Sequence, residues 1–363
     1  MLNYFNPSLS FKIHNLTFLI CIIAFGILFT SCHNSSIKSA VNNSSADSSL
    51  SKQHGGDTIP ARINYYTGLI SSNPANANAY WNRGKLEVLS KSYMPALADL
   101  TRAIRLDSTK SGYYYNLADV EFLTGHTHEA RDAFMVSIRL DPKNTDAMLK
   151  LAELYLYVEK YEDAITLINQ ALRVNPYIGK AYFLKGMIYI EKHDTAKAIS
   201  SIQTSIEQDP NNYDAYIQIG LLFAARGDAI ALSYYDDATN IEPQNPESYY
   251  DKGMFYQFGG DYDNAIKAYQ ELLQIDSTYK NAYYNLGVIY NEDKTDYTKS
   301  LGYFNQVIKY DTTYYMAYYG RANCFEMLKQ YDKALTDYNH AYRINPKFKE
   351  AEKAYQNLKS KTH

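Results

Sequence analysis

The chain has 363 residues, of which 46% are hydrophobic, so it is long enough to bury a sizeable core. Its formal net charge is only −3, so the total charge points neither to nucleic acid nor to an acidic membrane surface, and we expect no nucleic-acid partner. The three cysteines, Cys21, Cys32 and Cys324, have the spacing of neither a zinc site nor a disulfide framework.

Residues 1–31 have the pattern of a secretory signal. Lys12 and His14 precede an apolar run over 16–29, which is short for a membrane span and suits the hydrophobic region of a signal. The run is followed by Thr30-Ser31-Cys32, which resembles a bacterial lipobox, although Phe29 stands where leucine is usual. The resemblance implies that Cys32 is acylated and becomes the mature N-terminus. The alternatives are an uncleaved anchor helix and ordinary cleavage.

Residues 32–58 are predicted to be a flexible, disordered tether. The segment 33–58 contains eight serines and three asparagines, which bury too little apolar surface to offset the chain entropy lost on folding. His33 follows the cysteine where an aspartate would signal retention in the inner membrane of some bacteria. The lipobox resemblance therefore implies an outer-membrane lipoprotein. Because no acidic cluster follows Cys32, we expect it to face the periplasm.

From residue 77 the chain repeats itself about every 34 residues. The registers are 77–110, 111–144, 145–178, 179–212, 213–245, 246–279, 280–314 and 315–348. The fifth repeat is one residue short and the seventh one long, and we expect both changes in the turn between the two helices of the repeat. The fourth residue is aromatic in seven repeats, and the twentieth is alanine or serine. The eighth residue is always small: Gly84, Ala118, Ala152, Gly186, Gly220, Gly253, Gly287 and Ala322.

This periodicity predicts pairs of closely packed helices. Residues 4, 7, 8 and 11 share one face of the first helix, and small residues at 8 and 20 let the paired helices approach. The proline, serine or threonine at position 32 ends the second helix. The pattern resembles the tetratricopeptide repeat, which implies an all-α, right-handed α-solenoid of about eight repeats over 77–348. Residues 59–76 then form an N-terminal half-repeat helix, and 349–363 form a C-terminal capping helix.

The resemblance implies a concave groove lined mainly by positions 2, 5, 9, 12 and 13 of each repeat. Position 5 is apolar or aromatic in every repeat, which favours a partner-binding stripe or side chains that merely pack against neighbouring helices. Acidic residues prevail at the other groove positions, as a solvated face or as a groove selecting a basic or apolar segment. The candidate partner-binding residues are Trp81, Tyr115, Phe183, Tyr250, Tyr284, Tyr319, Asp119 and Glu153.

No catalytic motif accompanies the repeats, so we expect no enzyme activity and neither a cofactor nor a metal. His126-Thr127-His128-Glu129 lies in a predicted turn and is interpreted as a polar loop. The expected function is a protein–protein interaction scaffold at the outer membrane, anchored by lipid and binding other envelope proteins or peptide segments. The alternatives are a glycan-capture envelope lipoprotein and a regulatory subunit of an envelope enzyme.

Overall fold

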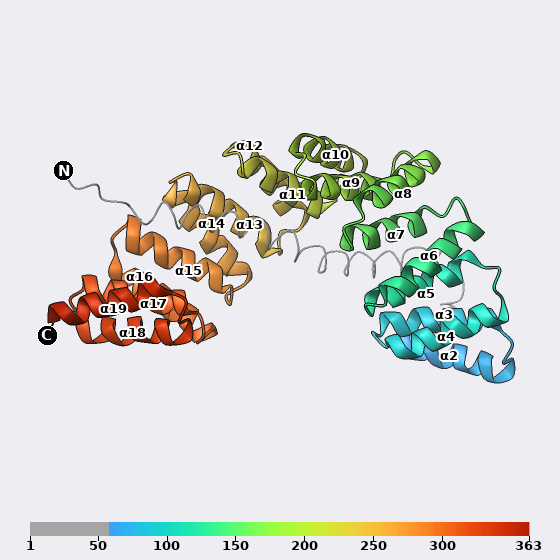
Figure 1. Ribbon diagram of the computed structural model, residues 1–363, viewed down its shortest axis with the longest axis horizontal. Coiled ribbons are helices and arrows are strands. Elements are labelled where there is room, and N and C mark those ends of the chain that lie inside the picture. The colour runs from blue at the N-terminus through green and yellow to red at the C-terminus, as the bar shows by residue number, and fades with distance from the viewer. Residues whose placement is uncertain (1–57, 363) are drawn as a thin grey trace. The chain divides into compact units, whose positions relative to one another are not determined.

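The computed structural model describes residues 58–362, which are almost wholly helical and contain no strand (Figure 1). The all-α fold expected from the repeat pattern is confirmed in this range. The predicted signal over 1–31, nearly all of the predicted tether and Cys32 lie outside the described residues. Within 58–362, every helix is too short or too polar to cross a membrane.

The chain divides into two compact units, Met1–Asn212 and Tyr213–His363, called here the N-terminal and C-terminal units. In the N-terminal unit a single helix precedes four helix pairs, and each helix packs against the next along the chain. The helices are α2 (Ile59–Ser72), α3 (Ala77–Leu89), α4 (Tyr93–Leu106), α5 (Ser111–Leu123), α6 (Thr127–Leu140), α7 (Thr145–Tyr157), α8 (Tyr161–Val174), α9 (Gly179–Glu191) and α10 (Thr195–Gln208).

The C-terminal unit contains four further pairs and a last single helix. Its helices are α11 (Tyr213–Ala224), α12 (Ile230–Ile241), α13 (Pro246–Phe258), α14 (Tyr262–Ile275), α15 (Lys280–Val288) with the π-helical turn η1 (Ile289–Asp293), α16 (Tyr297–Tyr310), α17 (Tyr315–Met327), α18 (Tyr331–Ile344) and α19 (Lys349–Thr362). Ala351 and Leu358 of α19 are buried, and Ala354 and Tyr355 pack beside them, while its other faces are polar.

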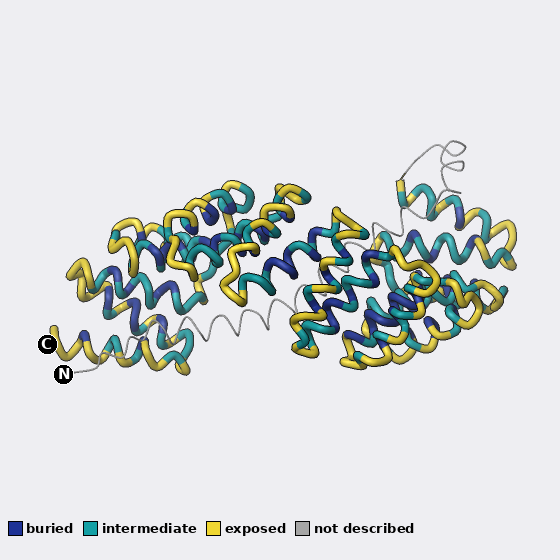
Figure 2. The backbone as a smooth tube through the Cα atoms, turned by 90° about the horizontal axis from the view of Figure 1, so that it is seen from above, coloured by how far each residue is buried: buried dark blue, intermediate teal, exposed yellow. Residues whose placement is uncertain are grey.

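The two helices of each pair meet where a small residue faces a large one. The glycine or alanine at position 8 is buried in all eight repeats, and the buried side chains that face it include Leu100, Ile202, Tyr235, Tyr269 and Phe304. An added Cβ at Gly253 would lie only 2.4 Å from the Tyr269 ring, so this approach needs glycine. In Figure 2 buried residues recur among partly buried ones along the helices, and exposed residues gather mainly at the turns.

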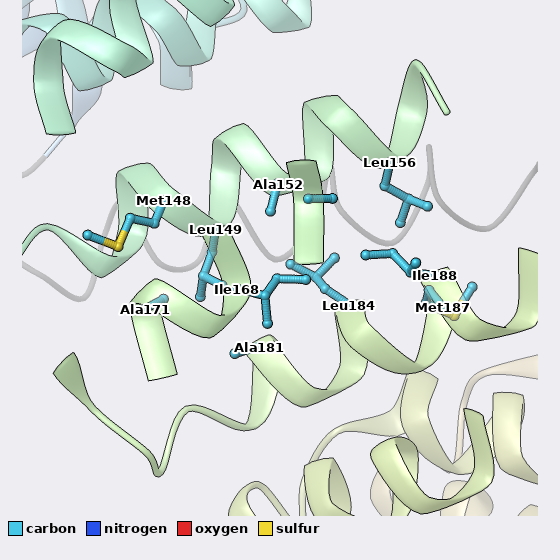
Figure 3. Close-up of a cluster of buried hydrophobic side chains, with 11 residues drawn as sticks. Met148, Leu149, Ala152, Leu156, Ile168, Ala171, Ala181, Leu184, Met187 and Ile188 are labelled. Carbon is cyan, nitrogen blue, oxygen red and sulfur yellow. The ribbon is translucent and has the colours of Figure 1, made fainter. Parts of the chain in front are cut away.

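The largest described core cluster joins the third and fourth repeats. Leu149 of α7, Ile168 of α8 and Leu184 of α9 point toward one another, and Ala171 and Ala181 allow the helices to come close (Figure 3). Each of these side chains is at most 3% exposed. The cluster therefore bridges two repeats, so neither repeat buries its apolar face alone.

The tyrosines at position 4 lie at the edge of the core, since most of these rings are only half-buried. Three of them donate a hydrogen bond from the hydroxyl to the backbone carbonyl six residues earlier, at position 32 of the preceding repeat. These are Tyr182 to Pro176, Tyr249 to Pro243 and Tyr283 to Ser277, over 3.1 to 3.3 Å. The chain has 38 tyrosines, and their number is explained in part by a phenol that covers the core and also satisfies a carbonyl in the turn between repeats.

Of the two repeats of unusual length, the seventh differs from the prediction in where its extra residue lies. In seven repeats the fifteenth residue has a positive φ, for example Lys91, Gly125 and Gly227, whereas in the seventh it is the sixteenth, Thr295. The extra residue of the seventh repeat therefore precedes the turn and is absorbed by η1, in which Lys294 N–H bonds to Ile289 O. Placing it in the turn was wrong, because a π-turn accommodates one more residue without moving the helix that follows.

Cys324 lies on α17 and is fully buried in the core. Burial raises the pKa of its thiol to about 11. Its Sγ donates to Ser300 Oγ at 3.1 Å, which ties α17 to α16. A neutral thiol in this position behaves as a small apolar side chain.

Candidate functional site

The position-5 side chains, predicted to form the binding stripe, pack against neighbouring side chains. Trp81 contacts the next repeat: its indole nitrogen donates to Asn116 Oδ1 at 2.6 Å, and its ring lies 5.4 Å from the Tyr113 ring. Tyr115 packs 6.1 Å from Phe134 of its own repeat, and Phe183 packs beside the cluster of Figure 3, which joins the third and fourth repeats. Position 5 thus contributes to contacts both within a repeat and between repeats.

In the C-terminal unit the same position is occupied by tyrosines that meet the following turn. Tyr250 lies 5.3 Å from Tyr279, Tyr284 lies 5.3 Å from Tyr314, and Tyr319 lies 5.1 Å from Phe348, between ring centroids. Tyr250 is only 8% exposed, whereas Tyr284 and Tyr319 are half-buried. These rings can present one edge to a partner at most, and their role in binding stays a prediction.

Trp81 also borders an open hollow of about 630 Å³ between the first two repeats. Its walls include Asn78 and Trp81 of α3, Gly112 and Tyr113 of α5, and Lys110 of the turn before α5. Gly112 leaves this space open, because the nearest atom to a Cβ added there would be Trp81 Cζ2 at 3.6 Å. Lys85 Nζ covers the opposite part of the indole, 3.8 Å from the ring centroid. We call this feature the Trp81 hollow.

The candidate acids of the N-terminal unit belong to a network of alternating charges. Lys150 Nζ lies 3.3 Å from both Asp119 Oδ1 and Glu153 Oε2, and Lys180 Nζ lies 2.5 Å from Glu153 Oε1. Lys150 and Glu153 are each 7% exposed. Burial alone would raise the pKa of Glu153, but Lys150 and Lys180 hold it below its usual range. The two lysines therefore favour the ionised form of Glu153.

The C-terminal unit has acids on α11 and α13 at positions 2 and 6, which Lys180 and Lys150 occupy in the N-terminal unit. Asp214 and Glu247 are at position 2, and Asp251 is at position 6, where it is 5% exposed. Burial, then Asp214 and Glu242, raise the pKa of Glu247 to about 7, and burial with Glu247 raises that of Asp251 well above its usual range. Lys252, the next residue along α13, pairs with Asp236 at 2.5 Å instead.

Sequence reasoning missed the importance of position 6, which was not among the expected groove positions. Lys150, Gln218 and Asp251 all occupy it, and all are at most 7% exposed. The repeat register could have indicated this position, because these three polar residues lie one turn from position 2, on the same face of the first helix.

The prediction that His126-Thr127-His128-Glu129 lies in a turn is wrong for three of the four residues, because His126 is the N-cap of α6 and Thr127, His128 and Glu129 lie in its first turn. His126 Nδ1 lies 2.7 Å from Glu121 Oε2, and the imidazole is 54% exposed. Among residues 58–362, no histidine, cysteine, aspartate or glutamate side chains gather in a group of three that could hold a metal ion.

Stability of the C-terminal unit should fall as pH rises from about 4.5 to about 7. In that window folding makes Glu247 retain a proton that the unfolded chain releases, since its pKa rises from 4.5 to about 7. Asp251 acts in the same direction. The groups that interact electrostatically with them include Asp214, Glu242 and the tyrosines Tyr213, Tyr235 and Tyr279, all of which are acids, so these interactions act in the same direction.

The measurement is urea unfolding at pH 5 and pH 8, with amide exchange in α13 as the local probe. Glu247→Gln should reduce the pH-dependent loss by roughly 1–3 kcal/mol, relative to wild type. An equal loss in both proteins would contradict the assignment.

The chain is similar to several solved structures. YrrB, described as "a TPR protein with an unusual peptide-binding site", is 27% identical, with 50% of this chain and 95% of that chain covered and a TM-score of 0.40. PilF of Pseudomonas aeruginosa is 18% identical, with 55% and 92% covered and a TM-score of 0.49. MamA is 24% identical, with 46% and 92% covered and a TM-score of 0.41. No curated protein sequence matches the chain.

Family models match most of the repeat region. Models described as tetratricopeptide repeat match residues 111–144, 149–213, 234–267, 281–314 and 315–348, and one described as TPR repeat matches 256–294. These boundaries include the periods read from the sequence at 111–144 and 315–348, and the helix pairs α5–α6 and α17–α18 fill them. The chain belongs to the tetratricopeptide repeat family.

Proposed function

We propose that this protein is an interaction scaffold that binds a segment of a partner protein on the groove face of its repeats, with the Trp81 hollow as one anchoring point. The family supports the class of function, since tetratricopeptide repeats generally bind other proteins. The observation that carries the choice of site is the hollow itself. It joins an indole and an asparagine at groove positions 5 and 2 with Lys110 of the turn before α5.

The hollow suits an apolar side chain of an extended segment. The indole supplies apolar surface, while Asn78 and Lys110 at the margin can hydrogen-bond to the partner's backbone carbonyls. Burying one such side chain against the indole contributes about 1.5–3 kcal/mol. Other contacts along the groove would supply the rest of the affinity.

Gly112→Leu should block the hollow without removing any existing contact. The leucine side chain would occupy the space beside Trp81, and replacing a helical glycine stabilises α5 by about 0.5–1 kcal/mol. We expect capture of partners from detergent-solubilised envelopes to fall at least about tenfold, followed by mass spectrometry. Gly302→Leu is the matched control, because Gly302 is exposed on α16 and nothing lies within 4 Å of an added Cβ. Identical partner lists for wild type and Gly112→Leu would remove the hollow from the proposal.

We propose further that the scaffold is held at the outer membrane, facing the periplasm, by acylation of Cys32. The support is the sequence pattern 16–32 and the serine- and asparagine-rich segment that follows it. Labelling cells with radioactive palmitate should mark the wild-type chain and leave Cys32→Ala unlabelled. Cys324→Ala is the control, since Cys324 is buried in the folded chain and its substitution should leave the label unchanged. Label on Cys32→Ala would reject the anchor and leave the scaffold proposal standing.

A further inference from the structure

Helices α11 and α13 bring four polar side chains to one face of the C-terminal unit. Asp214 and Gln218 are one turn apart on α11, and Glu247 and Asp251 are one turn apart on α13. These helices are the first helices of adjacent repeats, and they contact each other directly. Each pair occupies positions 2 and 6. We call the four residues the α11–α13 cluster.

Two members of this cluster are buried with an unsatisfied polar atom. Asp251 is 5% exposed and its Oδ2 has no hydrogen-bond partner among residues 58–362. Gln218 is 4% exposed, and within the same range its Nε2 likewise has no acceptor. Buried polar groups are rarely left in this condition, because each has lost its hydration without gaining a bond. One atom needs a donor and the other needs an acceptor.

In the N-terminal unit lysines stand beside the buried acids, although Asp119 Oδ1 and Glu153 Oε1 also lack a hydrogen bond among residues 58–362. There Lys150, at the same position 6, contacts Asp119 and Glu153, and Lys180, at position 2, contacts Glu153. In the α11–α13 cluster these two positions carry Gln218, Asp251, Asp214 and Glu247, so the lysines of the N-terminal unit are replaced by acids and an amide. Lys150 and Lys180 supply positive charge beside the acids of the N-terminal unit. In the α11–α13 cluster these positions supply none, so a cation there would have to come from other residues or from a partner.

The chemistry favours an organic cation over a metal ion. No group of three metal-ligating side chains stands close enough together in the described part of the chain, so a divalent ion would lack ligands. Tyrosine rings lie beside the acids instead. Tyr250 and Tyr279 have centroids 5.3 Å apart, and the Tyr213 hydroxyl accepts from the N–H of Ser248, the residue after Glu247, at 3.1 Å. Carboxylates among tyrosine faces suit an ammonium or a guanidinium.

Resting on the proposed scaffold function, we infer that the α11–α13 cluster binds a lysine or arginine side chain of the partner segment. The cation donates to Asp251 and Glu247, and a backbone carbonyl of the same segment accepts from Gln218 Nε2. An extended peptide is the occupant because it offers a cation and carbonyls within one residue of each other. The cluster thus gives the groove a preference for basic residues that the Trp81 hollow does not provide.

The test uses the full-length chain in detergent and four immobilised sublibraries of random octapeptides. The central residue is fixed as lysine, arginine, norleucine or glutamate, so that charge varies at similar length. We expect the lysine and arginine sublibraries to retain about 10- to 100-fold more protein than the norleucine one, with a difference that shrinks in high salt. Asp251→Asn and Glu247→Gln should each remove most of this preference.

Two further variants separate binding from folding and from net charge. Asp237→Asn makes the same charge change on an exposed part of α12 and should leave the preference intact. Glu247→Lys places an ammonium one turn from Asp251, as Lys180 does beside Glu153 in the N-terminal unit. It should abolish the preference while raising the temperature of unfolding, which a misfolded variant would not do.

The outcomes distinguish this inference from the proposed function. Equal retention on all four sublibraries would overturn the cation site and leave the scaffold proposal in place. A lysine and arginine preference that survives Asp251→Asn and Glu247→Gln would assign it to another surface and overturn the inference. Retention on none of the sublibraries would count against both.

Discussion

Arg83→Met is expected to destabilise the N-terminal unit by about 3 kcal/mol. Arg83 of α3 makes two parallel hydrogen bonds to Asp99 of α4, at 2.7 and 2.8 Å, and a third to Thr67 of α2 at 3.1 Å. Asp99 is 6% exposed, so removing the guanidinium leaves a buried carboxylate without its cation. Losing one partner of such a pair is much more damaging than replacing both, because desolvation of the remaining charge is no longer offset.

Urea unfolding followed by tryptophan fluorescence measures this effect well, because Trp81 is the single tryptophan and lies on the same helix as Arg83. Arg105→Met is the matched control, since Arg105 is exposed on α4 and its loss should change stability by less than about 0.5 kcal/mol. Adding Asp99→Leu to Arg83→Met should recover much of the loss. If the double variant is no more stable than Arg83→Met, the loss of stability comes from lost contact area and not from the unpaired buried carboxylate of Asp99.

Gly253→Val should destabilise the C-terminal unit by about 3 kcal/mol through overpacking. An added Cβ would lie 2.4 Å from Tyr269 Cε1, and valine adds two methyl groups to that clash. Tyr269 cannot easily move away, because it is fully buried and its hydroxyl donates to Gln257 Oε1 at 2.9 Å and accepts from Asn285 Nδ2 at 3.0 Å. The strain therefore falls on the contact between α13 and α14.

Amide exchange in α13 and α14 reports this change, with exchange in α3 and α4 as the reference. Gly253→Ala combined with Tyr269→Ile should be far less damaging than Gly253→Val, because it reproduces the Ala152–Ile168 pair of the third repeat. Gly302→Ala, at an exposed position of α16, is the matched glycine control, and it should stabilise the helix by about 0.5–1 kcal/mol. Unchanged exchange in Gly253→Val would mean that the helices separate more freely than their packing suggests.

Much of the fold follows from residues close in sequence. The small residues at positions 8 and 20 recur with the period of the repeat, and every one of them is buried against a partner helix of its own repeat. The extra residue of the seventh repeat was located less well, because its length shows in the sequence whereas the choice between a longer turn and a π-turn depends on hydrogen bonds such as Lys294 to Ile289.

The contacts of the candidate site were not predicted from the sequence. Position 5 is apolar or aromatic in every repeat, yet Trp81 packs against Tyr113 of the next repeat, and Tyr250 packs against Tyr279 in the turn that ends its own repeat. Sequence spacing places a side chain on a helix face, but it does not say how far the neighbouring repeat covers that face. The same limit hid Asp251, whose burial depends on α11 and on the turn before α15.

Helix pairing, repeat length and the small-to-large contacts inside each repeat are properties of local sequence, because they require only that apolar residues recur at helical spacing within about 34 positions. Which groove acids retain a cation is decided by tertiary structure. Glu153 and Asp251 are both buried acids on first helices, but only Glu153 has Lys150 and Lys180 within 3.3 Å. Charges interact through space and through the burial around them, so packing between repeats brings two lysines to Glu153, whereas Asp251 is buried beside Glu247 and its pKa is raised, although one oxygen of each acid lacks a hydrogen bond among residues 58–362.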